Sequence, residues 1–191
     1  MELYIARHGE TEYNLARRFQ GSGVDSPLTD NGITQAKTLG KAICSINFDA
    51  IFSSPLKRAM DTARFAFSDD DLFENQAFTD KRLVEIGLGE AEGKTWEEVG
   101  LSTMLDDPEK YIPPSGGESI KNMIVRVDSF LEELAEHSYK KIFVLTHGYV
   151  LRVIYACAMD KSVAAVGQAP FYDNCSLVRY KRNNNRWESI N

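Results

Sequence analysis

The sequence predicts an α/β fold, specifically a three-layer α/β/α sandwich with a mostly parallel central sheet. Three observations favour it: short apolar runs alternate with amphipathic helical segments, no repeat or Pro/Gly linker divides the chain, and two extended segments close it. Strands that alternate with helices pair in parallel, because each crossover helix returns the chain to the same edge. At 191 residues the chain suits one core, so we expect residues 1–191 to form a single domain.

The first elements are defined by their apolar periodicity. Residues 2–6 and 50–53 are short apolar runs of the kind that form buried strands. Between them, residues 31–44 predict a helix, whose buried face would carry Ile33, Ala36, Leu39, Gly40 and Ile43.

A helix start and an acidic segment follow the second strand. Ser54 is expected to be an N-cap with Pro55 in the first helical position, and the helix is expected to run to about Phe67. Residues 68–80 are expected to be an irregular loop. Its Asp69-Asp70-Asp71 run lacks the spaced ligands and the glycine of a calcium loop, so we expect solvated charge there.

The second half of the chain continues the alternation. A long helix is predicted from Gly116-Gly117, and its buried stripe would carry Ile120, Ile124, Val127, Leu131 and Leu134. Residues 141–146 predict a buried strand and residues 149–159 another helix. Residues 177–181 and 186–190 flank an Asn-rich turn and predict a closing hairpin.

Composition excludes several classes of protein. With 43% hydrophobic and 26% charged residues the chain is that of a globular protein, not a disordered or fibrous one. The net charge of −6 and the absence of a long basic run predict no nucleic-acid partner, because binding to phosphate backbones needs a basic face. No apolar run is long enough to span a bilayer, so no membrane association is expected.

The three cysteines are odd in number and far apart. Cys44, Cys157 and Cys175 form no Cys-x-x-Cys pair, which argues against a zinc site and a disulfide framework. Each lies in an apolar neighbourhood, so we expect buried free thiols and a cytoplasmic location.

Two histidines follow strands. Arg7, His8 and Gly9 come directly after the first strand, and His147 with Gly148 follows the strand 141–146. In open α/β folds the carboxyl ends of parallel strands meet at the edge where ligands bind, so the two imidazoles are expected to lie close together. Helices begin nearby, and their free N–H groups favour an anion.

Charged residues near these strand ends predict a phosphate site. Arg58 is expected in the first turn of its helix, where a cation is unfavourable to the helix dipole and therefore suggests a bound anion. Guanidinium and imidazole groups together match phosphate oxygens. Glu85 is the candidate acid that would protonate a leaving oxygen, with Glu10, Glu90 and Glu92 as alternatives. His137, near a helix end, is expected to be structural.

The chain resembles the histidine phosphatase superfamily, also called the phosphoglycerate-mutase-like family. The matching motifs occur in the family's order over nearly the whole chain: Ile5-Ala6-Arg7-His8-Gly9-Glu10-Thr11 with Asn14, Phe19-Gln20-Gly21, Asp25-Ser26-Pro27-Leu28-Thr29, Ser53-Ser54-Pro55-Leu56-Lys57-Arg58-Ala59 with Thr62-Ala63, Glu85 with Gly93, Gly116-Gly117-Glu118-Ser119, and Thr146-His147-Gly148. An isolated Arg-His-Gly tripeptide would be weak evidence for the family, whereas this ordered set of motifs is strong evidence. The resemblance implies a phosphoglycerate-mutase-like fold.

The resemblance also implies roles for individual residues. His8 would be the nucleophile that forms a phosphohistidine, and Glu85 the general acid and base. The phosphate would be bound by Arg7, Asn14, Arg58, His147 and Gly148. Gln20 and Gly21 would line the substrate side of the site, or alternatively close a turn. Glu10 and Thr11 would contact the site residues without taking part in the chemistry. No metal and no cofactor are expected, because the arginines supply positive charge.

The region 86–116 is expected to set specificity. It is short and contains only Lys94 and Lys110 as basic residues, which favours a phosphatase of small phosphomonoesters over a cofactor-dependent phosphoglycerate mutase. A phosphoprotein-binding module with little catalysis is a further alternative, but it would lack the nucleophile or the acid. Trp96 and Tyr111 are expected to pack loops rather than wall the pocket. No particular oligomeric state is predicted.

Overall fold

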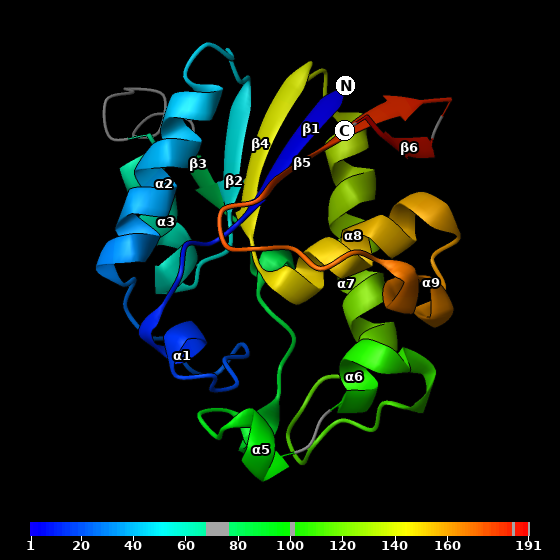
Figure 1. The fold of residues 1–191 in the computed structure, drawn as a ribbon. Coiled ribbons are helices and arrows are strands. Elements are labelled where there is room, and N and C mark those ends of the chain that lie inside the picture. The colour runs from blue at the N-terminus through cyan, green and yellow to red at the C-terminus, as the bar shows by residue number, and fades with distance from the viewer. Residues whose placement is uncertain (68–76, 100–101, 185, 191) are drawn as a thin grey trace.

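The computed structural model describes residues 1–67, 77–99, 102–184 and 186–190 (Figure 1). Its strands are β1 (Glu2–Arg7), β2 (Ala50–Ser53), β3 (Ala77–Thr79), β4 (Lys141–Thr146), β5 (Leu177–Asn183) and β6 (Arg186–Ser189). Its α-helices are α1 (Glu12–Leu15), α2 (Asp30–Ile43), α3 (Lys57–Ala66), α5 (Trp96–Val99), α6 (Ser102–Asp106), α7 (Ile120–Glu136), α8 (Gly148–Met159) and α9 (Val163–Gln168). Short 3₁₀ helices cover Lys81–Leu83, Gly89–Ala91 and Pro108–Lys110.

The strands form one six-stranded mixed sheet in the order β3-β2-β4-β1-β5-β6. Pairing is parallel from β3 through β2 and β4 to β1, and β5 and β6 add an antiparallel hairpin at the other edge. Helices α2 and α3 cover one face of the sheet and α7 and α8 the other (Figure 1). The predicted three-layer sandwich with a mostly parallel sheet is confirmed.

The two central strands are apolar throughout because both of their faces are buried. Side chains of a strand alternate between faces, so Leu3 and Ile5 pack toward α7 and α8 while Tyr4 and Ala6 pack toward α2 and α3. All four are at most 5% exposed. A continuous apolar run, rather than an alternating one, is what a parallel strand covered on both sides requires.

Two helices begin later than the sequence predicts. Helix α3 begins at Lys57 with Leu56 as its N-cap, so the prediction of Ser54 as the cap and Pro55 as the first helical residue is wrong. The Ser54 hydroxyl is instead used in the candidate site described below. The long helix α7 begins at Ile120, where the Ser119 side chain accepts a hydrogen bond from the third residue of the helix.

Two further expectations need correction. The segment 68–80, predicted as irregular, contains the edge strand β3, which pairs in parallel with β2; the Asp69-Asp70-Asp71 run lies outside the described residues. Of the three cysteines, Cys157 is buried, but Cys44 is exposed at the end of α2 and Cys175 is half-buried. Three-residue strands depend on their partner more than on their own sequence, which explains the first error.

Backbone hydrogen bonds continue past the carboxyl ends of β1 and β2 and join the residues that follow them to β4. The His8 N–H donates to the Thr146 carbonyl at 2.9 Å, and the Ser54 N–H donates to the Leu145 carbonyl at 2.9 Å. Helices α1, α5 and α6 lie at this same end of the molecule (Figure 1). Residues from distant parts of the sequence therefore converge there on a rigid frame.

Helices α2 and α3 approach closely at Gly40, and we expect the substitution Gly40→Ala to destabilise the fold. A Cβ at this position would lie 2.2 Å from the Ala66 carbonyl oxygen, so one helix must shift. We expect the free energy of unfolding, measured by urea denaturation, to fall by about 1–3 kcal/mol. Thr38→Ala, on an exposed face of α2, is the control and should stay within about 0.5 kcal/mol. An unchanged midpoint for Gly40→Ala would contradict the close packing.

Candidate active site

His8 is a neutral imidazole with one nitrogen free. It follows β1 directly and is 3% exposed. Its Nδ1 lies 2.8 Å from the Gly9 carbonyl oxygen. A carbonyl only accepts, so Nδ1 carries the hydrogen and Nε2 carries the lone pair. Burial lowers the pKa of His8 well below its ordinary value, and the nearby Arg58 and Arg7 charges lower it further. This is the state that a nitrogen nucleophile needs.

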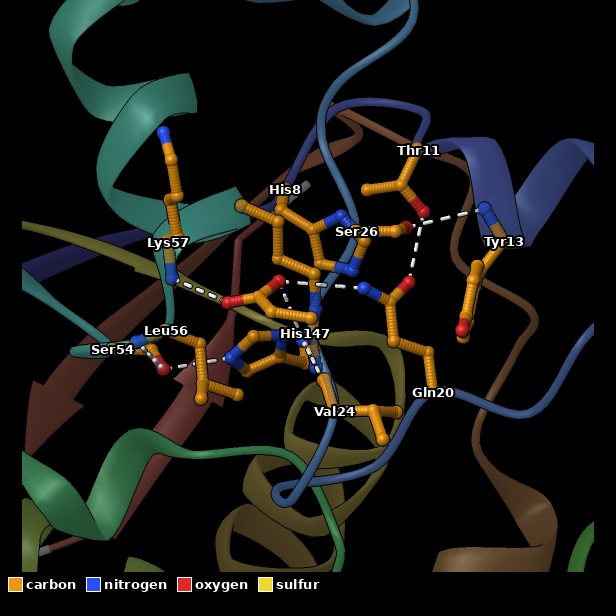
Figure 2. A network of polar contacts seen from close by, with 12 residues as sticks. His8, Thr11, Tyr13, Gln20, Val24, Ser26, Ser54, Leu56, Lys57 and His147 are labelled. Carbon is orange, nitrogen blue, oxygen red and sulfur yellow. Dashed lines mark hydrogen bonds and ion pairs between the residues drawn. The ribbon is translucent and has the colours of Figure 1, made fainter. Parts of the chain in front are cut away.

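His147 lies beside His8, with 5.2 Å between the ring centroids (Figure 2). It is the N-cap residue of α8, and its Nε2 lies 2.7 Å from the Ser54 Oγ. Ser54 is fully buried and its hydroxyl has no other acceptor among the described residues, so the hydroxyl hydrogen goes to Nε2 and the imidazole keeps its own hydrogen on Nδ1. That Nδ1 is buried and has no hydrogen-bond partner among the described residues. Burial, followed by the Arg58 charge, lowers the pKa of His147 well below its ordinary value.

Ser54 fixes the His147 ring, and we expect Ser54→Ala to lower kcat/KM for a phosphomonoester about tenfold. The variant loses the hydrogen bond that selects the tautomer and leaves Nε2 buried without a partner. Ser53→Ala is a matched control, because the Ser53 hydroxyl is equally buried but donates to the Ser54 carbonyl and not to the imidazole. Steady-state kinetics of both variants check the prediction. Equal losses in the two would contradict it.

Two arginines bring further unpartnered nitrogens to the site. Arg7 donates from Nη1 to the Tyr172 carbonyl at 2.7 Å, and its Nε is buried without a described partner. Gly148 leaves room for it, since a Cβ there would lie 3.3 Å from that Nε. Arg58 is 1% exposed and its Nε is likewise unpartnered. With His147 Nδ1, three buried N–H groups near His8 lack an acceptor.

Asp25 explains how Arg58 is tolerated in the first turn of α3. Arg58 Nη1 donates to the Asp25 carboxylate at 3.0 Å, and Nη2 donates to the Gly21 carbonyl at 2.9 Å. The Lys57 N–H donates to the same carboxylate at 2.6 Å, so an anion already occupies this helix end. The prediction that the unfavourable position alone indicates a bound anion is therefore incomplete. The Nε atom of Arg58 is buried without a described partner, so it remains available to bind an anion.

Side-chain hydrogen bonds connect Thr11 through Gln20, both labelled in Figure 2, to Asp25. The Thr11 hydroxyl donates to Gln20 Oε1 at 2.8 Å, and Gln20 Nε2 donates to Asp25 at 3.3 Å. Gln20 also lines the cavity, whereas Gly21 is not among the lining residues and its carbonyl accepts a hydrogen bond from Arg58. Thr11 contacts Gln20 and is not itself among the residues that line the cavity.

Asn14 is oriented by two donors. Its Oδ1 accepts hydrogen bonds from the Thr11 N–H and from Asn174 Nδ2, each at 3.2 Å. Both use the oxygen, so the amide orientation is determined and the Asn14 nitrogen is left to donate elsewhere. Asn174 also donates to the His8 carbonyl at 3.0 Å. Sequence reasoning missed Asn174, which lies in a segment without regular structure and carries no motif.

Glu85 is a half-buried carboxylate that lines the cavity. It accepts hydrogen bonds from the Ile86 N–H at 2.9 Å and from the Tyr149 N–H, in the first turn of α8, at 3.2 Å. Burial raises the pKa of Glu85 above its ordinary value, against the lowering effect of those N–H groups and of Arg58 and Arg7. A raised pKa is what a general acid near neutral pH needs.

The alternative carboxylates are engaged elsewhere. Glu10 accepts a hydrogen bond from the Thr29 hydroxyl at 2.7 Å. Glu92 accepts from the Leu88 and Gly23 N–H groups at 3.0 and 2.9 Å. Glu90 is exposed, and none of the three lines the cavity.

Arg7, His8, Asn14, Gln20 and Glu85 line a cavity of about 390 Å³. Its walls are mostly apolar and include Phe19, Ile86, Leu88, Trp96, Met104, Leu105, Tyr149, Phe171 and Tyr172. The expectation that Trp96 only packs a loop is wrong, since it lines the cavity and is 51% exposed; Tyr111 packs in the core as expected. Arg58 and His147 are buried and are not among the lining residues. His137 caps α7 at its C-terminus, where its ring stacks on Tyr139.

Besides Arg7, two further basic residues that line the cavity, Arg18 and Arg152, come from outside the region 86–116. The sequence reading counted only Lys94 and Lys110 within that region and missed them. A signal existed for Arg152, because it lies four residues after Gly148 on the same helix and therefore on the same face.

A pair of neutral imidazoles surrounded by unpartnered cationic nitrogens, at the carboxyl ends of parallel strands, defines a phosphate-handling site of the histidine phosphatase type. The chain belongs to the histidine phosphatase superfamily (branch 1), whose family model matches residues 3–191. The resemblance seen in the motifs is thereby confirmed.

Several known proteins are similar in sequence to this chain. The metal-independent phosphoserine phosphatase of Arabidopsis thaliana is 34% identical over 165 residues, which cover 81% of this chain and 67% of that protein. Fructose-2,6-bisphosphatase TIGAR of Xenopus tropicalis is 36% identical over 135 residues, 69% of this chain but only 49% of TIGAR. This chain thus spans about half of TIGAR.

Solved structures match over the full length. YhfR of Bacillus stearothermophilus superposes with a TM-score of 0.89 at 29% identity. The match covers 98% of this chain and 94% of the YhfR chain. The alpha-ribazole phosphatase of Shigella flexneri gives a TM-score of 0.87 at 25% identity, covering 100% and 95%.

Proposed function

We propose that this protein is a phosphoric monoester hydrolase that acts on small phosphorylated metabolites through a phosphohistidine on His8, without a metal ion. The observation that carries the proposal is the neutral His8 with its free Nε2, next to three buried N–H groups of Arg7, Arg58 and His147 that lack acceptors. Buried donors without partners are rare, and a phosphoryl group would satisfy all three. The phosphatases among the relatives support the same reaction class.

In the first step His8 Nε2 attacks phosphorus. The bond from phosphorus to the ester oxygen breaks, and the electron pair leaves with that oxygen, which takes the proton of Glu85. Arg7, Arg58 and His147 donate to the phosphoryl oxygens and offset the charge that spreads over them in the transition state. Asn14 adds a neutral donor through its amide nitrogen.

In the second step water attacks the phosphohistidine. Glu85, now ionised, accepts a proton from the water as its oxygen bonds to phosphorus and the nitrogen–phosphorus bond breaks. Inorganic phosphate leaves, and His8 and Glu85 return to their starting states. The arginines supply the positive charge that a metal ion supplies in other phosphatases.

The part of the substrate beyond the phosphate would lie against the apolar wall. Trp96, Met104 and Leu105, from the region 86–116, contribute to this wall, which supports the proposal that the region sets specificity. No described helix is long and apolar enough to cross a membrane. We place the activity in the cytoplasm, in keeping with the unpaired cysteines.

Hydrolysis of p-nitrophenyl phosphate in excess EDTA tests the proposal. We expect turnover that chelation does not reduce, followed by turnover of natural phosphomonoesters. Phosphoryl transfer between hydroxyl groups of a phosphorylated acid, without net hydrolysis, would instead identify a mutase. Binding of phosphorylated ligands without either reaction would identify a binding module.

A further inference from the structure

The backbone at Glu85 forms neither a helix nor a strand. Glu85 lies between the 3₁₀ helix Lys81–Leu83 and an isolated antiparallel bridge that joins Leu88 to Gly117. Backbone outside regular structure has no ladder of hydrogen bonds to fix it, so its N–H and carbonyl groups need partners from elsewhere in the chain. The position of the Glu85 carboxyl group therefore depends on the groups that bind the backbone of residues 82–88.

An ion pair on the N-terminal part of α7 supplies such groups. Arg126 lies on α7 and donates from Nε and Nη2 to the two carboxylate oxygens of Glu118, at 2.7 and 2.8 Å. The two side chains are only 18% and 21% exposed. Two parallel hydrogen bonds fix the plane of the guanidinium, so its remaining N–H groups point in defined directions.

Arg126 directs those remaining N–H groups at the Glu85 segment. Its Nη1 donates to the Arg82 carbonyl at 2.6 Å, and its Nη2 also donates to the Glu85 carbonyl at 3.4 Å. The second of these carbonyls belongs to the candidate general acid itself. Arg126 therefore binds Glu85 through its backbone, while the Glu85 side chain lines the cavity.

Glu118 binds the other end of the same segment. Its Oε2 accepts a hydrogen bond from the Gly87 N–H at 3.4 Å, and its own N–H donates to the Gly87 carbonyl at 2.7 Å. The ion pair thus contacts the segment before, at and after Glu85. The Ile86 N–H, which donates to the Glu85 carboxylate, lies between these contacts, so a shift of the segment would move the acid together with that donor.

We infer that Arg126 and Glu118 are positioning residues for the general acid: their ion pair holds the backbone of Glu85 so that its carboxyl group can donate a proton to the leaving oxygen. The inference rests on the proposed function, in which Glu85 protonates that oxygen. Neither Arg126 nor Glu118 is among the residues that line the cavity, so they act through Glu85 and not on the substrate.

The dependence of the rate on the leaving group tests the inference. Benzyl phosphate releases an alkoxide, which needs a proton, whereas p-nitrophenyl phosphate is of similar size and releases a stable phenolate. Arg126→Gln should lower kcat/KM for benzyl phosphate about ten- to hundredfold, because a small displacement of a catalytic group costs on this order. The same variant should lower kcat/KM for p-nitrophenyl phosphate less than about threefold, since that reaction does not need the acid.

A double variant gives a second readout that a merely structural role would not produce. In a protein that already carries Glu85→Gln, adding Arg126→Gln should change kcat/KM for benzyl phosphate less than about twofold, because the acid that Arg126 positions is already absent. A general loss of packing would instead lower the rate by the same factor in both backgrounds.

Two further variants separate positioning from folding. Arg82→Gln is the matched control: Arg82 also pairs with an acid on α7, Glu133 at 2.7 Å, and its side chain is 26% exposed, but that side chain does not bind the Glu85 backbone. It should leave the ratio of the two substrates unchanged. Glu118→Gln keeps the size of the side chain and one acceptor oxygen, so it should lower the benzyl phosphate rate selectively but less than Arg126→Gln. This milder variant keeps the test valid if Arg126→Gln does not fold.

Several outcomes would overturn the inference. Equal losses for the two substrates in Arg126→Gln and Glu118→Gln, no loss for benzyl phosphate in either folded variant, or a full further loss in the Glu85→Gln background would each leave the ion pair with a structural role only. In those cases Glu85→Gln by itself would still discriminate between the two leaving groups. If Glu85→Gln did not discriminate, the proposed role of Glu85 would fail, and this inference would fail with it.

Discussion

His8→Ala is expected to reduce hydrolysis of p-nitrophenyl phosphate on the order of 10⁴-fold or more, with the fold intact. The nucleophile cannot be replaced by a neighbour: His147 Nε2 is bound to Ser54, and its Nδ1 carries a hydrogen. Water could still attack phosphate held by the arginines, but without the covalent intermediate one difficult step is no longer divided into two. Steady-state kinetics and the thermal unfolding midpoint measure both parts of the prediction.

A second histidine provides the control. His137→Ala removes an imidazole that stacks on Tyr139 at the end of α7, away from the cavity, and should leave turnover unchanged. Mass spectrometry after an alkaline quench should detect a phosphoryl adduct on His8 in the natural sequence and none in His8→Ala. An active His8→Ala protein, or an adduct on another residue, would rule out the proposed intermediate.

The parts of the site that the sequence predicts are those attached to strand ends. The apolar runs of β1 and β4 define those strands, and Arg7, His8 and His147 follow them directly. Because parallel strands end at one edge, the two histidines could be placed together despite their distance in sequence. The resemblance of the motifs then assigned their roles.

The residues that sequence reasoning missed act through tertiary contacts. Asp25 holds Arg58, Asn174 orients Asn14, and Ser54 binds His147. Each is a polar residue whose local sequence also suits a turn or a cap, and Ser54 was assigned to a helix cap for that reason. Only the positions of β2, α3 and β4 in three dimensions show that its hydroxyl faces an imidazole.

The charge around the cavity is also difficult to predict from sequence, for the same reason. Counting basic residues within 86–116 predicts a weakly basic specificity region, but a cavity gathers side chains from many segments. Arg18 follows α1 and Arg152 lies on α8, and both line the cavity. Net charge along a stretch of sequence therefore says little about the charge around a bound substrate.

Glu85→Gln is expected to lower kcat/KM for an alkyl phosphate, which reports the step that breaks the ester bond, about 10²- to 10⁴-fold. An alkoxide is a poor leaving group, so it depends on the proton that Glu85 provides, and glutamine provides none. p-Nitrophenolate leaves without protonation, so the loss for p-nitrophenyl phosphate should be much smaller in the first step. The ratio of the two losses distinguishes proton donation from a merely structural role. Glu90→Gln, which alters an exposed carboxylate outside the cavity, should change neither substrate.

The pH dependence of the alkyl reaction gives an independent test. Burial raises the pKa of Glu85, so its carboxyl group keeps its proton to higher pH than an exposed glutamate, and the rate should fall only as the pH rises through that raised value. Burial lowers the pKa of His8, so loss of the nucleophile by protonation should begin only well below its ordinary pKa. The profile should therefore be bell-shaped, and Glu85→Gln should remove its alkaline limb while leaving the acidic one. If the alkaline limb remained in that variant, another group would be the general acid. Glu85 would then need a different role.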